Sequence, residues 1–184
     1  YLWSNGDTTQ QLQNVSAGVY VVSVIDSNSC ILYDTVTILQ PLPISANPII
    51  SNVSCNGFLD GRVELYPSGG NGVYDIIWET GDSSFIINNL LSDWYSVSII
   101  DSNSCALIDS FYVGQPTLLY DTIGFTNVSC NGYSDGHASV FVYGSVPPYN
   151  YLWSNGDTSQ SISNISSGVY FVMISDLNNC ILYD

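Results

Sequence analysis

A repeat with a fixed period of 75 residues runs through the whole chain. The residues that mark it most clearly are tryptophans and cysteines: Trp3, Trp78 and Trp153, and then Cys30, Cys105 and Cys180. Residues 151–184 repeat residues 1–34 at most positions, beginning with Tyr-Leu-Trp-Ser-Asn-Gly-Asp-Thr. Self-similarity at a fixed period indicates one structural unit copied in tandem, so the fold is that of an array.

The period divides the chain into three parts. We expect residues 1–41 to be the C-terminal half of one unit, residues 42–116 a complete unit, and residues 117–184 a nearly complete one. Because the chain begins and ends at unrelated phases of the repeat, we expect it to be a segment of a longer array.

The pattern within a unit predicts β-strands. Segments rich in Val, Ile, Tyr and Thr are separated about every 8–12 residues by Gly, Asn, Asp, Ser or Pro, which is typical of an all-β sandwich. In the central unit we expect strands at residues 49–53, 62–66, 73–78, 85–88, 94–100 and 106–113. The fold expected is therefore all-β, with tandem immunoglobulin-like β-sandwich repeats of period 75.

The fifth of these strands predicts which face is buried. Side chains alternate between the two faces of a strand, so Tyr95, Val97 and Ile99 share one face and Ser96 and Ser98 share the other. The tyrosine and aliphatic residues recur in the other copies, and we expect them to form the core.

A turn is expected after each tryptophan-bearing strand. Asn5-Gly6 and Asn155-Gly156 occupy this place, and Asn-Gly tolerates positive φ at both positions, as a two-residue type I′ hairpin requires. The middle copy has Thr80-Gly81 there, so its turn is expected to differ slightly.

The charge and amino-acid composition argue against several classes of binding partner. Sixteen acidic residues accompany one basic residue, Arg62, for a net charge of −15, which argues against binding to nucleic acid or to anionic lipid. No apolar run approaches the roughly 20 residues that span a bilayer, so this segment is not expected to insert into a membrane. Asn, Ser, Thr, Gly and Tyr in place of Lys and Glu favour a protein of an extracellular surface.

The sequence contains few residues that could support catalysis or bind a cofactor. His137 is the only histidine, and Arg62 occupies its position in the other copy, so a histidine-based triad would exist in one unit alone. The chain has no Gly-rich phosphate loop and no Cys-x-x-Cys pair. We therefore expect neither an enzyme nor a cofactor protein.

Two disulfide pairings fit the five cysteines. The favoured one lies within units, Cys55–Cys105 and Cys130–Cys180, with the partner of Cys30 outside this segment. The alternative crosses the unit boundary, Cys30–Cys55 and Cys105–Cys130, and leaves Cys180 free. Sequence alone does not choose between such connectivities.

Three Asp-x-Asn pairs are weak candidates for calcium ligands: Asp26 and Asn28, Asp101 and Asn103, and Asp176 and Asn178. The alternative is an Asx turn at a hairpin, in which the carboxylate accepts a backbone N–H two residues on. Calcium needs six to eight oxygen ligands, and no loop here has the carboxylate density of an EF-hand.

Two aromatic residues are candidates for ligand contacts. Trp94 precedes the inward-facing Tyr95 and is therefore expected on the outer face, and Phe171 falls on the same face in the next copy. If these rings are exposed, a surface polysaccharide or a protein is the expected ligand.

Three ordered motifs together resemble a known family. They are Val-Ser-Cys-Asn-Gly-x-x-Asp-Gly (53–61 and 128–136), Pro-Pro-Tyr-x-Tyr-Leu-Trp-Ser-Asn-Gly (147–156), and Asn-x-Ser-x-Gly-x-Tyr followed by Asp-x-Asn-x-Cys (14–30 and 164–180). Their order and spacing are similar to those of the SprB repeat of very large cell-surface adhesins from gliding Bacteroidetes. The middle copy departs most, with Ser-Gly-Gly-Asn-Gly-Val-Tyr in place of the Pro-Pro-Tyr turn.

The resemblance implies an extracellular protein attached to the outer membrane, with a role in adhesion or gliding. The function expected for this segment is a structural stalk or filament whose partners are neighbouring repeats of the same chain. The alternative is a carbohydrate- or protein-binding immunoglobulin-like module. The resemblance also implies O-glycosylation at Asp-Thr followed by an aliphatic residue or Thr, with Thr8, Thr35 and Thr122 as acceptors. Ordinary strand and turn composition explains the same pattern.

Overall fold

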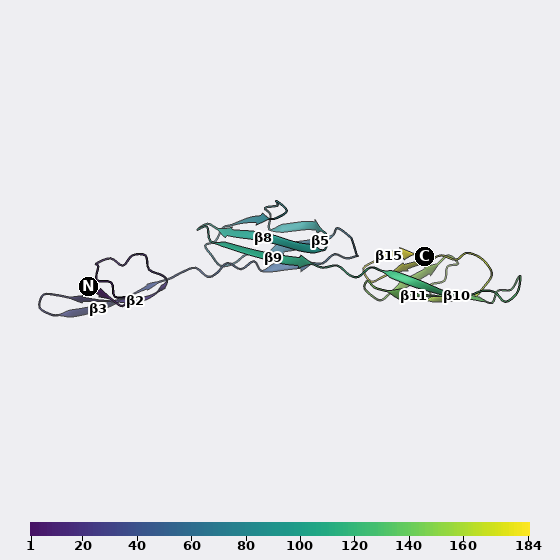
Figure 1. Ribbon diagram of the computed structural model, residues 1–184, viewed down its shortest axis with the longest axis horizontal. Helices are drawn as coiled ribbons and strands as arrows, with labels where there is room; N and C mark the ends of the chain where they lie inside the picture. The colour runs from purple at the N-terminus through teal and green to yellow at the C-terminus, as the bar shows by residue number, and fades with distance from the viewer.

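A computed structural model describes all residues from Tyr1 to Asp184 and consists of strands and loops. Three bodies follow one another along the long axis of the molecule (Figure 1). No helix is long and apolar enough to cross a membrane.

The N-terminal body is a single antiparallel sheet. It contains β1 (Leu2–Trp3), β2 (Gly18–Ile25) and β3 (Ile31–Ile38), in the order β1-β2-β3. Every residue of β3 is exposed. Tyr20, Val22 and Val24 are only half-buried because no second sheet covers their face.

The middle body has two three-stranded antiparallel sheets. One contains β4 (Pro48–Ser51), β5 (Gly61–Leu65) and β7 (Ile86–Leu90), and the other contains β6 (Tyr74–Trp78), β8 (Asp93–Asp101) and β9 (Ala106–Val113). Their orders are β4-β5-β7 and β6-β8-β9. All six strands expected in this unit are present, with ends that differ by no more than two residues.

The two sheets face each other across one core. Apolar side chains from both sheets form a single buried cluster of 12 residues, in which Val63, Trp78 and Ile99 are almost fully buried. Val97 and Ile99 lie on the core face as expected, and Tyr95 packs at its edge. Ser96 and Ser98 lie half-buried on the other face.

The C-terminal body repeats this arrangement. Its sheets are β10 (Tyr120–Thr126), β11 (Gly136–Tyr143) and β13 (Ser161–Ile165), and β12 (Asn150–Trp153), β14 (Val172–Ser175) and β15 (Ile181–Tyr183). A smaller cluster of 6 buried residues fills the space between them. Trp153 lies there as Trp78 does in the middle body, and each indole N–H donates to a backbone carbonyl six residues on.

The expected type I′ hairpin after the tryptophan strand is wrong. β6 and β7 belong to different sheets, so the turn between them carries the chain from one sheet to the other. Gly6, Gly81 and Gly156 have φ of +90°, +86° and +88°, whereas the residues before them do not have positive φ. Only the glycine position needs positive φ, so Thr80 fits as well as asparagine and all three turns are alike.

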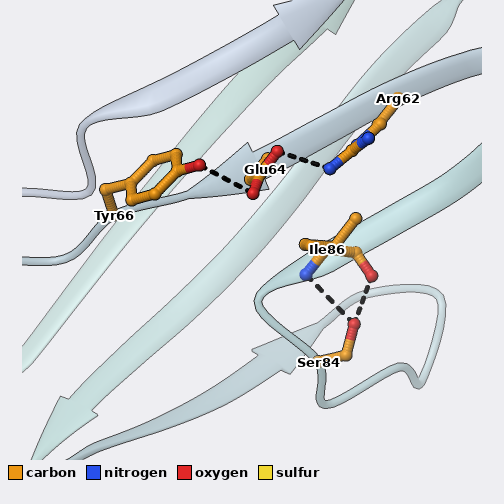
Figure 2. A network of polar contacts seen from close by, with 5 residues as sticks. All are labelled: Arg62, Glu64, Tyr66, Ser84 and Ile86. Carbon is orange, nitrogen blue, oxygen red and sulfur yellow. Dashed lines mark hydrogen bonds and ion pairs between the residues drawn. The ribbon is translucent and has the colours of Figure 1, made fainter.

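The outer face of β5 carries the one ion pair of the structure. Arg62 and Glu64 alternate with the buried Val63 and Leu65, and Arg62 Nη2 lies 2.5 Å from Glu64 Oε2. Tyr66 donates to the other oxygen of Glu64 at 2.7 Å (Figure 2). That hydrogen bond, together with the charge of Glu64, raises the pKa of Tyr66. Because both side chains are partly open to solvent, which screens their charges, the ion pair contributes little stability.

Two isoleucines on paired strands test the assignment of faces. Ile99 is 0 % exposed and Ile108 is 77 % exposed. Ile99→Ala should lower the free energy of unfolding of the middle unit by about 2–5 kcal/mol, because it leaves a cavity in the core. The matched Ile108→Ala change should stay within about 0.5 kcal/mol. Urea denaturation of the full chain measures both, and equal losses would contradict the assignment.

Candidate functional site

The structure contains one disulfide, and it joins two different units. Cys55 lies in the loop between β4 and β5, and Cys180 lies in the hairpin between β14 and β15. Their Cα atoms are 5.6 Å apart although 125 residues separate them in sequence. The junction between the middle and C-terminal bodies is therefore closed covalently, and it is the candidate functional site.

Both predicted pairings are wrong. Cys105 and Cys130 are free and exposed, and so is Cys30. Cys55 lies at the end of the middle unit that faces the C-terminal body, whereas Cys105 lies at the opposite end, beside residues 40–44. The nine residues of β8 separate these two ends by about 30 Å. A disulfide needs Cα atoms about 4.4–6.8 Å apart, so a pair within this unit is impossible.

The loop that carries Cys55 also binds the linker that follows β9. We define the Cys55 loop as residues 53–57. Asn56 donates its side-chain N–H to the carbonyl of Pro116 at 3.0 Å, and the N–H of Gly57 donates to Gln115 Oε1 at 2.8 Å. From the next unit, Asn178 Nδ2 donates to the carbonyl of Ser54 at 2.8 Å.

Apolar packing supports these polar contacts. Leu119 is 7 % exposed and packs with Cys55 and Cys180, and partly buried residues of the C-terminal unit surround all three. In the linker before the middle unit, Leu42 is exposed and Ile44 packs against the core of the middle unit. Thr117, in the linker before the C-terminal unit, contacts that unit through its backbone carbonyl.

The far half of the same linker is held by the C-terminal unit. Ser145 N–H donates to the carbonyl of Thr117 at 3.0 Å. Gly144 has φ +77°, and a Cβ there would lie 1.9 Å from the carbonyl oxygen of Leu118. Only glycine permits this close approach of two backbones. Residues 115–119 are therefore bound along their whole length.

The Asp-x-Asn pairs form Asx turns at three hairpins. Asp26, Asp101 and Asp176 each accept two backbone N–H groups through Oδ1, from the asparagine two residues on and the cysteine four residues on. These bonds present Cys30, Cys105 and Cys180 at equivalent positions. The side chain of Asn178 points to Ser54. Calcium binding by these residues stays a prediction.

Asp176 is the most enclosed of these carboxylates, with 1 % exposure. Burial by itself raises its pKa, but hydrogen bonds from the Ser145 hydroxyl and from the N–H groups of Cys180, Val146 and Asn178 outweigh it, so the pKa lies below its usual value. The ionised carboxylate therefore ties the Cys180 hairpin to residues 145–146.

The candidate ligand contacts lie away from the junction. Trp94 is 60 % exposed and Phe171 is 63 % exposed. Trp94 packs against Tyr112, with ring centroids 5.4 Å apart. Ligand binding at these rings stays a prediction, as does glycosylation of Thr8, Thr35 and Thr122, all of which are exposed.

One cavity lies beside the core of the C-terminal unit. It measures about 500 Å³ and lies in the C-terminal unit among Ile123, Phe125, Ala138, Trp153 and Tyr170. In the middle unit, Phe111 and Val113 of β9 belong to the core at the corresponding strand positions. In the C-terminal unit, Ala138 and Trp153 line this space and belong to the core cluster.

Sequence reasoning missed most of the junction. Ser54, Asn56 and Gln115 were not singled out as contact residues, although Cys-Asn-Gly and Gln-Pro recur at the same phase of the repeat. That recurrence shows that these residues belong to every unit. It does not indicate that a loop of one unit contacts a hairpin of the next.

Removal of the disulfide tests its contribution to stability. The double substitution Cys55→Ser and Cys180→Ser should lower the combined unfolding free energy of the two units by about 4–5 kcal/mol in the chain-entropy model. Replacing the free, exposed Cys105 and Cys130 by serine is the matched control and should change it by less than about 0.5 kcal/mol. Urea denaturation without reductant measures both. An equal effect of the two double variants would contradict the assigned pairing.

Asp176 predicts an acid-sensitive C-terminal unit. Because the folded-state pKa is lowered, the stabilisation is present above the unfolded pKa of about 3.9 and is lost as pH falls through the folded value. Asp176→Asn should cost about 1–3 kcal/mol at pH 7, because an NH₂ group in place of Oδ2 cannot accept the hydrogen bonds from Ser145 and Val146.

The same variant should depend less on pH below about 4. Asp75→Asn, at an exposed carboxylate whose side chain accepts no hydrogen bond, is the control and should leave the unfolding midpoint unchanged. Thermal melts from pH 7 to acid measure both, and an unchanged acid response in Asp176→Asn would contradict the role of this carboxylate.

Comparison with known proteins agrees with the motif resemblance. Two segments match the family model described as SprB repeat, residues 47–83 and 122–158. The first spans β4 to β6 with Cys55, and the second spans most of β10 through β12 with Cys130. Comparison with curated proteins found no match. The chain is therefore similar to the SprB repeat at two places, one 75-residue period apart.

Proposed function

We propose that this chain is a structural stalk or filament segment of a large cell-surface adhesin, built from tandem immunoglobulin-like β-sandwiches of period 75. The SprB repeat is a non-enzymatic repeat family that suggests a cell-surface adhesin-type region. The proposed location is extracellular, attached to the outer membrane, with a role in adhesion or gliding.

The observation that carries the proposal is the closed junction. Between the middle and C-terminal units, the linker is bound by the Cys55 loop on one side and by residues 144–145 on the other. A flexible tether between independent domains would leave such residues solvated. A stalk keeps its length and its direction best when neighbouring units are fixed relative to each other.

The disulfide also changes how tension passes through the chain. When the two ends are pulled, force travels along residues 1–55, crosses to Cys180 and continues to residue 184. Residues 56–179 lie outside this covalent path. Strands β5 to β14 are then shielded from load, whereas β4 and β15 lie on the loaded path. This arrangement suits a segment that holds a cell against drag.

An exposed pair of aromatic side chains supports a second function, ligand binding. The Trp94–Tyr112 pair is exposed on β8 and β9, and exposed aromatic faces are common in ligand recognition. A carbohydrate- or protein-binding module is therefore the alternative. Glycan-array binding that is lost on Trp94→Ala, with an unchanged unfolding midpoint, would favour it.

Force extension of single molecules tests the stalk proposal. Reduction of the oxidised chain should add on the order of 400 Å of extension, because about 3.4 Å per residue is released over a separation of 125 residues. Cys55→Ser should give the long extension without reductant. The Cys105→Ser and Cys130→Ser double variant should behave as the parent chain. Equal extension with and without reductant would contradict a load-bearing junction.

A further inference from the structure

The sheet β10-β11-β13 presents an uncharged outer face to solvent. Its outward positions alternate with core residues such as Ala138 and Val140, and there are ten of them: four on β10, four on β11 and two on β13. We call them the β11 face: the even-numbered residues of 120–126, the odd-numbered residues of 137–143, and residues 161 and 163. None of the ten is Asp, Glu, Lys or Arg, although the chain has sixteen acidic residues.

Three aromatic rings occupy one end of the β11 face. Tyr120 lies opposite Tyr143 on the paired strand, and their rings stack with centroids 5.3 Å apart and planes inclined by 22°. Phe141 follows on the same face of β11, about 7 Å from Tyr143 along the strand. Its ring leans across Gly124, where a Cβ would lie 3.5 Å from the ring. All three rings are exposed, so together they form a flat apolar surface.

Hydroxyl and imidazole groups occupy the other end of the β11 face. His137 Nε2 lies 2.8 Å from Ser139 Oγ, and the Ser139 hydroxyl donates to Ser161 Oγ at 2.9 Å. Because the hydrogen of Ser139 is used in that bond, the His137 N–H is the donor to Ser139. The hydroxyl hydrogen of Ser161 is then free to donate to a ligand. Thr126 and Ser163 flank His137 on the paired strands, and both are exposed.

The β-sandwich itself does not require this surface. In the middle unit, Ser45 and Ser68 stand at the positions of the two tyrosines, and Arg62 and Glu64 stand at those of the histidine and the serine beside it. The backbones of Ser45 and Ser68 pair as those of the tyrosines do. The same strands therefore carry a charged outer face in one unit and an aromatic, uncharged face in the next. Folding does not explain this difference, whereas binding does.

We propose that the β11 face binds an uncharged polysaccharide. A pyranose ring has a face of C–H groups, which stacks on an aromatic ring, and a rim of hydroxyl groups, which donate and accept hydrogen bonds. The rings of Tyr120, Phe141 and Tyr143 take the C–H faces of the sugar chain, and His137 and Ser161 bind its hydroxyl groups. This site lies in the C-terminal unit, whereas the aromatic pair on β8 and β9 lies in the middle unit. It does not depend on the stalk function.

The size and charge of the β11 face favour this occupant over a second copy of the chain. A stable protein–protein interface uses about 20–30 residues on each side, and this face has ten. The core of an interface between identical chains is mainly apolar, whereas six of these ten residues are Ser, Thr or His. A net charge of −15 also repels a second copy, and it repels anionic polysaccharides in the same way.

Native affinity electrophoresis of the full chain tests the proposal. The gels contain galactomannan, xyloglucan or amylose as uncharged polymers, and alginate as the anionic polymer. We expect the chain to migrate more slowly in at least one of the uncharged gels than a non-binding acidic reference protein does, and to keep its ordinary mobility in alginate. Ordinary mobility in all three uncharged gels, or equal retardation in alginate, would overturn the proposal.

Matched variants locate the bound polymer. Tyr143→Ala and Phe141→Thr should each raise the apparent dissociation constant at least fivefold, with an unchanged thermal midpoint because both rings are exposed. Tyr66→Ala, at an exposed aromatic residue of the middle unit, is the matched control and should bind as the parent chain does.

Two results would assign the face or the polymer differently and so overturn the proposal. One is binding that is lost in Trp94→Ala but kept in Tyr143→Ala, which would place the polymer on the middle unit. The other is a concentration-dependent dimer in sedimentation velocity that Tyr143→Ala abolishes, because that would assign the β11 face to a second copy of the chain.

Discussion

The bond between Cys55 and Cys180 places a loop of one unit against a hairpin of the next, and the rest of the junction depends on this contact. Asn56 and Gly57 bind the linker beside this bond, and Leu119 is buried against the two cysteines. The hairpin in turn depends on Asp176, whose carboxylate accepts N–H groups from both the hairpin and residue 146. A short chain of local contacts thus fixes two units relative to each other.

This arrangement compensates for small cores. The middle unit buries a cluster of 12 apolar residues and the C-terminal unit a cluster of 6, which is modest for independent domains. A cross-link within each unit would stabilise that unit alone. A cross-link between units instead closes a long loop of chain and joins the stability of neighbours, as in other repeat proteins. It also maintains direction along the array, which a stalk needs (Figure 1).

The three free cysteines follow the same geometry. Cys30 and Cys105 occupy the hairpin position of Cys180, and Cys130 occupies the loop position of Cys55. Each is one half of the pair seen at the junction. A net charge of −15 opposes non-specific association between copies of the chain.

The sequence by itself determined the strands, the core face and the repeat, because these depend on short-range alternation and on turn residues. Val97 and Ile99 are buried and Trp94 is exposed, as alternation alone predicts. Only the tertiary structure decided the cysteine pairing and the path after Trp78. Cysteines at a constant phase have the same pattern whether they pair within a unit or between neighbours, and only the position of each strand end in space distinguishes the two. The turn at Gly81 likewise looks local, but which sheet the next strand joins depends on packing across the core.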